Sequence, residues 1–203
     1  MLDEEILTRI QAASCAVGRL RDRVFNCRDL TTETKLMVYN QCVIPILLYG
    51  SESWTLYHHN IRQLRTIQQR HLRSILKIKW DDFVTNDEVL DLATYEDIEA
   101  VLTRNRFRWL GHVARMPDDR PVKELLYGEL GVGKRRVGRP LLRYKDTLKV
   151  SLIKGDVLHT WSEVVNDSSS WRRTTFGTAV KMDQCGREEN IKKRQRRHQS
   201  NLS

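Results

Sequence analysis

Apolar residues recur at steps of three and four through most of this chain, and that spacing predicts a protein built from α-helices. Across residues 6–24 the apolar positions form one continuous stripe, as in a helix that packs a single face into a core. Residues 60–78, 98–113 and 141–152 repeat the same spacing. No segment alternates apolar and polar residues for long enough to predict a β-strand. The fold class that follows is mainly α.

Local signals predict where several of these helices begin and end. The polar stretch Thr31–Thr34 can start a second helix, and Pro45 should kink or end it because proline has no amide proton to donate. Asn86 can cap a short helix. Thr94 and Asp97 have the spacing of a capping box that would open the next helix.

Glycine, proline and basic residues gather between residues 128 and 140, which makes this stretch the clearest break in the chain. The basic run near the C-terminus has almost no apolar residue to bury, and such composition is typical of disorder. We therefore expect a helical domain over residues 1–127, a Gly-rich basic loop over 128–140, a smaller helical segment over 141–185 and a disordered basic tail over 186–203.

The charge balance points to a polyanionic partner. Among the 203 residues, 35 are Lys or Arg and 26 are Asp or Glu, which gives a formal net charge of +9. An excess of this kind is common in proteins that bind nucleic acid. The longest apolar run, Val43 to Tyr49, is far shorter than the ~20 residues that span a bilayer. We expect no membrane partner and a nuclear or cytoplasmic location, and the sequence does not indicate an oligomeric state.

Lysine and arginine gather in three sets that are candidates for contacts with RNA or DNA phosphates. The segment over residues 60–78 bears the first set without an intervening acid, although a plain solvated face remains the alternative. The first set is Arg62, Arg65, Arg70, Arg73 and Lys77, the second is Arg104, Arg106 and Arg108, and the third is Lys134, Arg135, Arg136 and Arg139.

The C-terminal tail contains a further basic run. A run of this kind is typical of a nuclear localisation signal or of a nonspecific nucleic-acid arm, and an expendable solvated tail is the alternative. The residues concerned are Lys192, Lys193, Arg194, Arg196 and Arg197.

We find no motif for catalysis, a cofactor or a metal ion. Polymerases and nucleases hold two metal ions on clustered carboxylates. The two acidic pairs, Asp81–Asp82 and Asp118–Asp119, lack the aromatic residue two positions earlier that a polymerase hairpin has, so we interpret them as acids of turns or helix ends. None of the four cysteines forms a Cys-x-x-Cys pair, so we expect buried, reduced thiols and no zinc site.

Five tryptophans could stack on bases, but most lie where a core side chain is the simpler interpretation. Trp109 belongs to an apolar stripe, so we place it in the core. We make the same prediction for Trp54 and Trp80.

Three motifs in sequence order resemble one family. They are Leu47-Leu48-Tyr49-Gly50-Ser51-Glu52-Ser53-Trp54, then Arg108-Trp109-Leu110-Gly111-His112-Val113-Ala114-Arg115-Met116, then Gly138-Arg139-Pro140 with Arg143, Tyr144 and Asp146. Together they resemble the region that follows the palm in reverse transcriptases of non-LTR (LINE-type) retrotransposons, particularly the RTE and jockey-like groups. A weaker match follows at Asp167-Ser168-Ser169-Ser170-Trp171-Arg172. Two positions depart from the pattern of the family: Tyr144 stands where the family often has Trp, and Ser168 stands where Arg usually follows the Asp.

The resemblance implies a helical thumb-like bundle that holds a template–primer duplex or the element's RNA. It also implies that the polymerase aspartates belong to a palm that this chain lacks, so we expect no enzyme activity from the chain alone. The first hypothesis is therefore a catalytically incomplete reverse transcriptase fragment that binds RNA, DNA or a hybrid duplex without sequence specificity. The alternative is a structural or interaction remnant with no selected nucleic-acid activity. A third hypothesis is complementation of a separately encoded palm.

Overall fold

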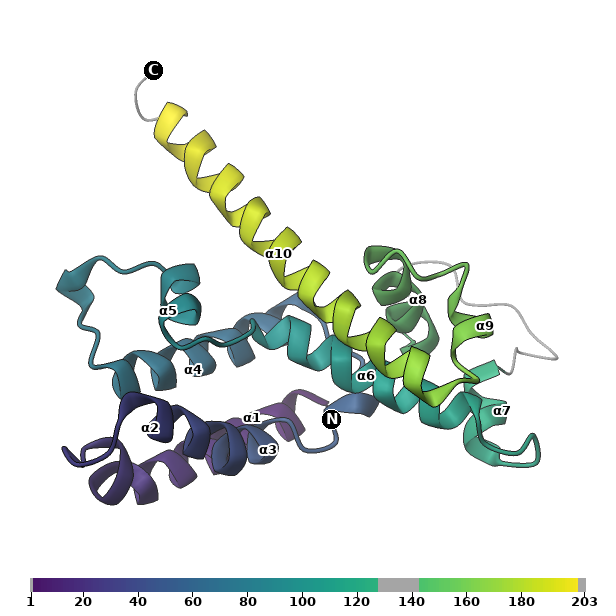
Figure 1. The fold of residues 1–203 in the computed structure, drawn as a ribbon, viewed down its shortest axis with the longest axis horizontal. Coiled ribbons are helices and arrows are strands. Elements are labelled where there is room, and N and C mark those ends of the chain that lie inside the picture. Colours follow the sequence, from purple (N-terminus) through teal and green to yellow (C-terminus); the bar gives the residue numbers. More distant parts are fainter. Residues whose placement is uncertain (1, 128–142, 201–203) are drawn as a thin grey trace. The chain divides into compact units, whose positions relative to one another are not determined.

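The computed structural model describes residues 2–127 and 143–200, and all of its regular secondary structure is helical, as expected (Figure 1). The chain divides into two compact units. Unit 1 is Met1–Ser51 with Leu56–Glu99, and unit 2 is Glu52–Thr55 with Ala100–Ser203. The division therefore lies near residue 99 and not at the expected loop over 128–140. Among the described residues, no helix is long and apolar enough to cross a membrane.

Unit 1 is a set of short and long helices around an aliphatic core. Its elements are α1 (Leu2–Leu20), the π-helix η1 (Arg21–Phe25), α2 (Thr32–Val38), the π-helix η2 (Tyr39–Val43), α3 (Ile44–Leu47), α4 (His58–Leu76), the 3-10 turn η4 (Trp80–Asp82) and α5 (Asn86–Leu92). The apolar stripes predicted from the sequence form the buried faces, which include Ile6, Ala13, Val17, Leu64, Leu72 and Ile75. The expected helices over residues 6–24 and 60–78 are thus confirmed.

Capping explains several boundaries in unit 1. Thr31 Oγ1 accepts the amide of Thr34 at 3.2 Å at the start of α2, as expected. Pro45 lies in the first turn of α3, where its missing amide proton costs nothing, and the chain before it widens into η2. The cap of α5 is Thr85 and not Asn86: Thr85 forms a capping box with Glu88.

The predicted capping box of Thr94 and Asp97 is wrong. Thr94 adopts a left-handed backbone conformation with φ of 50°, and the next helix, α6 (Ile98–Ala114), begins at Ile98. Asp97 Oδ1 instead accepts the amide of Glu99 at 2.9 Å, so Asp97 caps the helix from the position directly before it.

A buried histidine lies in the core of unit 1. His71 is 5% exposed, and its Nδ1 lies 3.5 Å from the hydroxyl of Tyr39. Burial lowers the pKa of His71 to about 4, with the charge of Arg70 as a second cause. The imidazole is therefore neutral near pH 7.

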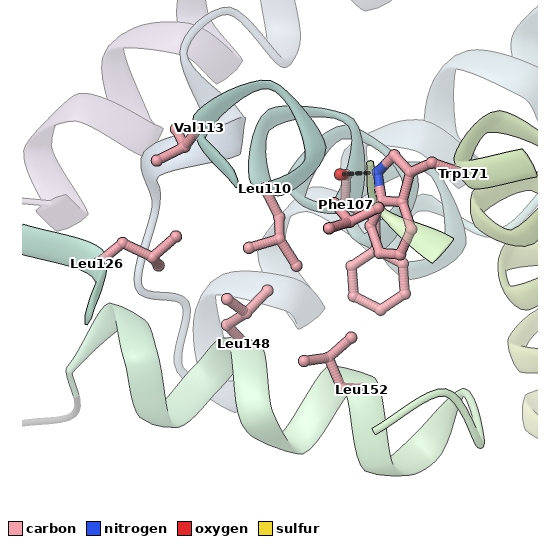
Figure 2. Close-up of a cluster of buried hydrophobic side chains, with 8 residues drawn as sticks. Phe107, Leu110, Val113, Leu126, Leu148, Leu152 and Trp171 are labelled. Atoms are coloured by element: carbon pink, nitrogen blue, oxygen red, sulfur yellow. Dashed lines mark hydrogen bonds between the residues drawn. The ribbon is translucent and has the colours of Figure 1, made fainter. Parts of the chain in front are cut away.

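Unit 2 contains most of α6, then α7 (Pro121–Tyr127), α8 (Tyr144–Lys154), α9 (Trp161–Val164) and α10 (Ser168–Ser200). The sequence did not indicate α7, whereas α8 follows the stripe predicted over residues 141–152. One cluster of buried side chains joins these helices (Figure 2): Phe107, Leu110, Val113, Leu126, Leu148, Leu152, Val165 and Trp171. Because α6 and α8 share this core, the residues on both sides of the 128–142 segment belong to one unit.

Trp171 ties the start of α10 to α6. Its side chain is 3% exposed, and its Nε1 donates to the backbone oxygen of Phe107 at 2.8 Å (Figure 2). Gly111 faces the indole, and a Cβ at that position would overlap Nε1 and Cδ1 of Trp171. The glycine is therefore what permits the close approach of the two helices.

Helix α10 continues past residue 186, where we expected disorder, and it ends at Ser200 (Figure 1). Ion pairs between successive turns accompany this extension. Arg187 Nε contacts Asp183 at 2.8 Å, and Lys193 Nζ lies 3.6 Å from Glu189. Such i,i+4 pairs, together with Lys, Arg, Glu and Gln residues, favour a helix even where little surface is buried. Residues 201–203 lie outside the described chain.

Candidate nucleic-acid interface

Arg65, from the first basic set, holds unit 1 together. Its Nε and Nη2 donate to the two carboxylate oxygens of Asp97 at 2.7 and 2.8 Å, and Nη2 also lies 3.3 Å from Glu99. The hydrogen bonds to Asp97 are the main reason why the pKa of Arg65 is raised. A guanidinium in a bidentate pair with a carboxylate has few N–H donors left for a phosphate.

Two further members of that set also have partners within unit 1. Arg73 Nη2 donates to the backbone oxygen of Val84 at 2.8 Å and to Asn86 Oδ1 at 2.9 Å. Lys77 donates to Asn26 Oδ1 at 2.6 Å. Arg73 and Lys77 thus support the turn after α4 and the end of η1. Within the first set, the structure leaves Arg62 and Arg70 as exposed cations on α4.

The second basic set divides between the interior and the surface of unit 2. Arg106 is 5% exposed and donates to Ser151 Oγ at 2.8 Å, so it is a structural residue. Arg104 and Arg108, which lie four residues apart, point to the same side of α6 and line a hollow at the surface.

This hollow, which we call the arginine hollow, brings together four arginines from two segments that are distant in the sequence. It has a volume of about 350 Å³ and lies between α6 and the first two turns of α10. None of its lining residues is acidic. They are Arg104, Arg108, Arg115, Ser168, Trp171, Arg172, Thr175 and Phe176.

The floor of the hollow is buried, whereas its rim is exposed. Trp171 and Thr175 are 3% and 2% exposed, and Phe176 is 57% exposed. Arg115 Nη1 donates to the backbone oxygen of Val165 at 2.8 Å, which fixes one guanidinium in place. Arg108 and Arg172 are exposed.

An acid lies beside the hollow but has its own partners. Asp167 accepts the amides of Ser169 and Ser170 at 3.1 and 3.0 Å and caps α10. Hydrogen bonds from Ser170, then from Ser169, hold the pKa of Asp167 well below its usual range. The carboxylate thus neutralises the first amides of α10 and leaves the arginines as the groups that face the hollow.

The sequence pointed to Arg104 and Arg108 but missed Arg115 and Arg172. A signal for Arg115 was present, because residues 104, 108, 111 and 115 follow the spacing of one helix face. Gly111 occupies the middle of that face. Arg172 lies 64 residues after Arg108, and only the packing of α10 on α6 brings these two residues to one hollow.

The remaining predicted contacts lie elsewhere. Lys134, Arg135, Arg136 and Arg139 lie outside the described residues. In the tail, Lys192, Lys193 and Arg196 are exposed and Arg194 is half-buried on α10, while the side chain of Arg197 also lies outside the described part of the chain.

One acid of each acidic pair has a structural partner. Asp82 Oδ2 accepts the amide of Lys79 at 2.7 Å in η4, and Asp118 pairs with Lys123 Nζ at 2.7 Å. Within the described part of the chain, no three His, Cys, Asp or Glu side chains are placed to hold a metal ion.

Two expectations about burial are wrong. Cys15, Cys42 and Cys185 are exposed and Cys27 is partly exposed, so the thiols are not core groups. Trp80 is 88% exposed, because η4 turns it to solvent beside Phe83, which is 84% exposed. The other two tryptophan predictions agree better with the structure: Trp54 is 5% exposed, and Trp109 is half-buried with its ring centroid 5.2 Å from that of Tyr144.

One comparison with known proteins indicates where the chain comes from. A transposon-derived protein of Caenorhabditis elegans, itself uncharacterised, is 26% identical over 156 residues. The match covers 72% of this chain and 56% of that protein, so the chain spans little more than half of its relative's length. No protein-family model and no solved structure matches the chain. The likeness supports a transposon origin.

Proposed function

We propose that this chain is a thumb-like part of a non-LTR retrotransposon reverse transcriptase that binds RNA, DNA or a hybrid duplex through phosphates, without sequence specificity and without catalysis of its own. The arginine hollow is the principal point of attachment. The order of the three family-like motifs supports the retrotransposon origin, and the transposon-derived relative is consistent with it.

The single observation behind the binding proposal is the convergence of four arginines on one hollow with no acid among its lining residues. Like charges repel one another, so an arrangement of this kind is unfavourable unless an anion neutralises it. The planar guanidinium group matches the oxygens of a phosphate with two parallel hydrogen bonds. Phosphate contacts position a nucleic acid but do not distinguish bases, so we expect binding through them to be independent of sequence.

Fluorescence anisotropy with a labelled RNA–DNA hybrid, measured across a salt series, tests this function. We expect the double variant Arg108→Ala/Arg172→Ala to weaken binding and to reduce the salt slope by about 0.7–0.9 for each phosphate that the variant no longer neutralises. Arg173→Ala is the matched control, because Arg173 is an exposed arginine of α10 that donates to Ser170 and does not line the hollow. Equal affinities and slopes for the double variant and the control would contradict the proposal.

A variant of the tail separates the proposed function from its alternative, a remnant without selected activity. Replacing Lys192, Lys193, Arg194 and Arg196 by Gln removes charge from α10 far from the hollow. If this variant keeps most of the affinity, binding belongs to the body of unit 2. If it loses all binding, the chain is better described as a remnant with a basic tail.

A further inference from the structure

The arginine hollow is more than a charged surface. Its volume of about 350 Å³ lies at the lower end of the range of about 300–1,000 Å³ for small-ligand pockets. Phosphates on the outside of a duplex need only a flat or gently curved basic surface. A hollow of this size can instead enclose a single phosphate group and part of the nucleotide attached to it.

The charge of the hollow favours a phosphate at the end of a strand. An internal phosphodiester has one negative charge, whereas a phosphate monoester has about 1.5 to 2 near pH 7 and three acceptor oxygens. Coulomb attraction grows in proportion to that charge. Two exposed guanidinium groups, Arg108 of α6 and Arg172 of α10, face the hollow together, and their combined N–H donors match the three oxygens of a phosphate monoester better than the two free oxygens of a phosphodiester.

Two residues of α10 add to this preference. Phe176 follows Arg172 by four residues, so its exposed ring lies on the same helix face, one turn further on. A ring can stack only on a base whose face is not covered by another base, as at a strand end. Thr175 lines the same hollow and is 2% exposed, yet its Oγ1 has no hydrogen-bond partner among the described residues. An unsatisfied buried hydroxyl is uncommon, and an oxygen of a bound ligand can complete it.

We propose that the arginine hollow binds the end of a nucleic-acid strand, with the terminal phosphate among the arginines and the terminal base stacked on Phe176. This inference rests on the proposed nucleic-acid binding of the same hollow. In this inference the hollow binds the terminal phosphate of a strand and not the internal phosphates of a continuous backbone.

The test compares three fluorescently labelled single strands of one sequence: one with a 5′-phosphate, one with a 3′-phosphate and one with hydroxyl groups at both ends. Each label sits in the middle of the strand. The full chain, Arg172→Ala, Phe176→Leu and the control Arg173→Ala are compared by anisotropy, with circular dichroism to establish that each is folded. Arg172 and Phe176 are exposed, so their replacement leaves the core of unit 2 intact.

We expect one phosphorylated strand to bind the full chain about tenfold more tightly than the unphosphorylated strand, and the strand that gains identifies the end that is held. Arg172→Ala should abolish that gain, Phe176→Leu should weaken binding of the phosphorylated strand, and Arg173→Ala should leave the gain unchanged.

Three results would overturn the inference. If the three strands bind equally and Arg172→Ala weakens them all, the hollow holds internal phosphates and only the proposed function survives. If the gain persists in Arg172→Ala, it arises outside the hollow. If Arg172→Ala changes the binding of neither the strands nor the hybrid duplex, the inference and the proposed function both fail.

Discussion

Replacing Gly111 by alanine should separate two helices of unit 2. A Cβ at this position would overlap the Nε1 and Cδ1 atoms of Trp171 and would lie 3.1 Å from Arg115 Nη1. The indole is 3% exposed and packs against Phe107 with ring centroids 6.0 Å apart, so it cannot move away from Gly111 without giving up that packing and its hydrogen bond to Phe107. The added methyl group must therefore displace α10 from α6.

The size of the effect follows from three contributions. Overpacking a core typically costs about 1–3 kcal/mol. Breaking the bond from Trp171 Nε1 to the backbone oxygen of Phe107 leaves buried polar groups unpaired and costs about 1–3 kcal/mol more. Alanine in place of glycine within a helix stabilises the folded state by about 0.5–1 kcal/mol, which offsets part of that cost. We expect Gly111→Ala to lower the free energy of unfolding by about 3 kcal/mol.

Gly177 is the matched control, because it lies in α10 and a Cβ there would meet nothing within 4 Å. Gly177→Ala should stabilise the protein by about 0.5–1 kcal/mol. Urea unfolding followed by circular dichroism measures both variants, and the indole N–H resonance of Trp171 reports the broken hydrogen bond. If Gly111→Ala proves as stable as Gly177→Ala, the close packing of α10 on α6 is refuted. The arginine hollow would then lose its structural basis, because that packing forms it.

Three further predictions concern unit 1. Because the pKa of His71 is about 4 in the folded chain and 6.5 in the unfolded one, the unfolded state gains a proton first, and about 3 kcal/mol of stability should be lost as pH falls from 6.5 to 4. His71→Gln should flatten that loss in urea titrations, and equal slopes would contradict the reasoning. Arg65→Met should destabilise unit 1 by about 2 kcal/mol in urea titrations, because it removes the charged hydrogen bonds that Arg65 donates to Asp97 and Glu99, whereas Arg62→Met should change little. Thr85→Ala should cost about 1 kcal/mol in the same assay through loss of the α5 cap, and an unchanged midpoint would contradict that role.

The helices could be predicted because their signal is local. An amphipathic helix repeats its apolar positions with the period of its own backbone hydrogen bonds, so α4 (His58–Leu76) lies within two residues of the range predicted for it. The residues at which helices begin and end were less predictable. Thr85 and Asn86 both suit a cap, and the choice between them depends on whether the residue three positions later can reach back, as Glu88 does for Thr85.

The candidate site could be predicted only in part. Arg65, Arg73 and Arg106 look like surface cations in the sequence, but each has a structural partner, and for Arg65 the partner Asp97 lies 32 residues away. Trp80 looked like a core residue, yet it is 88% exposed because a 3-10 turn follows α4. A single aromatic or basic residue contains no local information about which remote segment will cover it.

The sequence by itself determined that this protein is helical and basic and that its motifs are like those of a retrotransposon protein. Those properties depend on residue types and on spacing within one segment. Tertiary structure alone decided which arginines are structural and which line a hollow. Arg108 and Arg172 come together only because Gly111 leaves space for Trp171. Whether a guanidinium is structural or exposed depends on the segment that packs beside it, and that segment can be distant in the sequence.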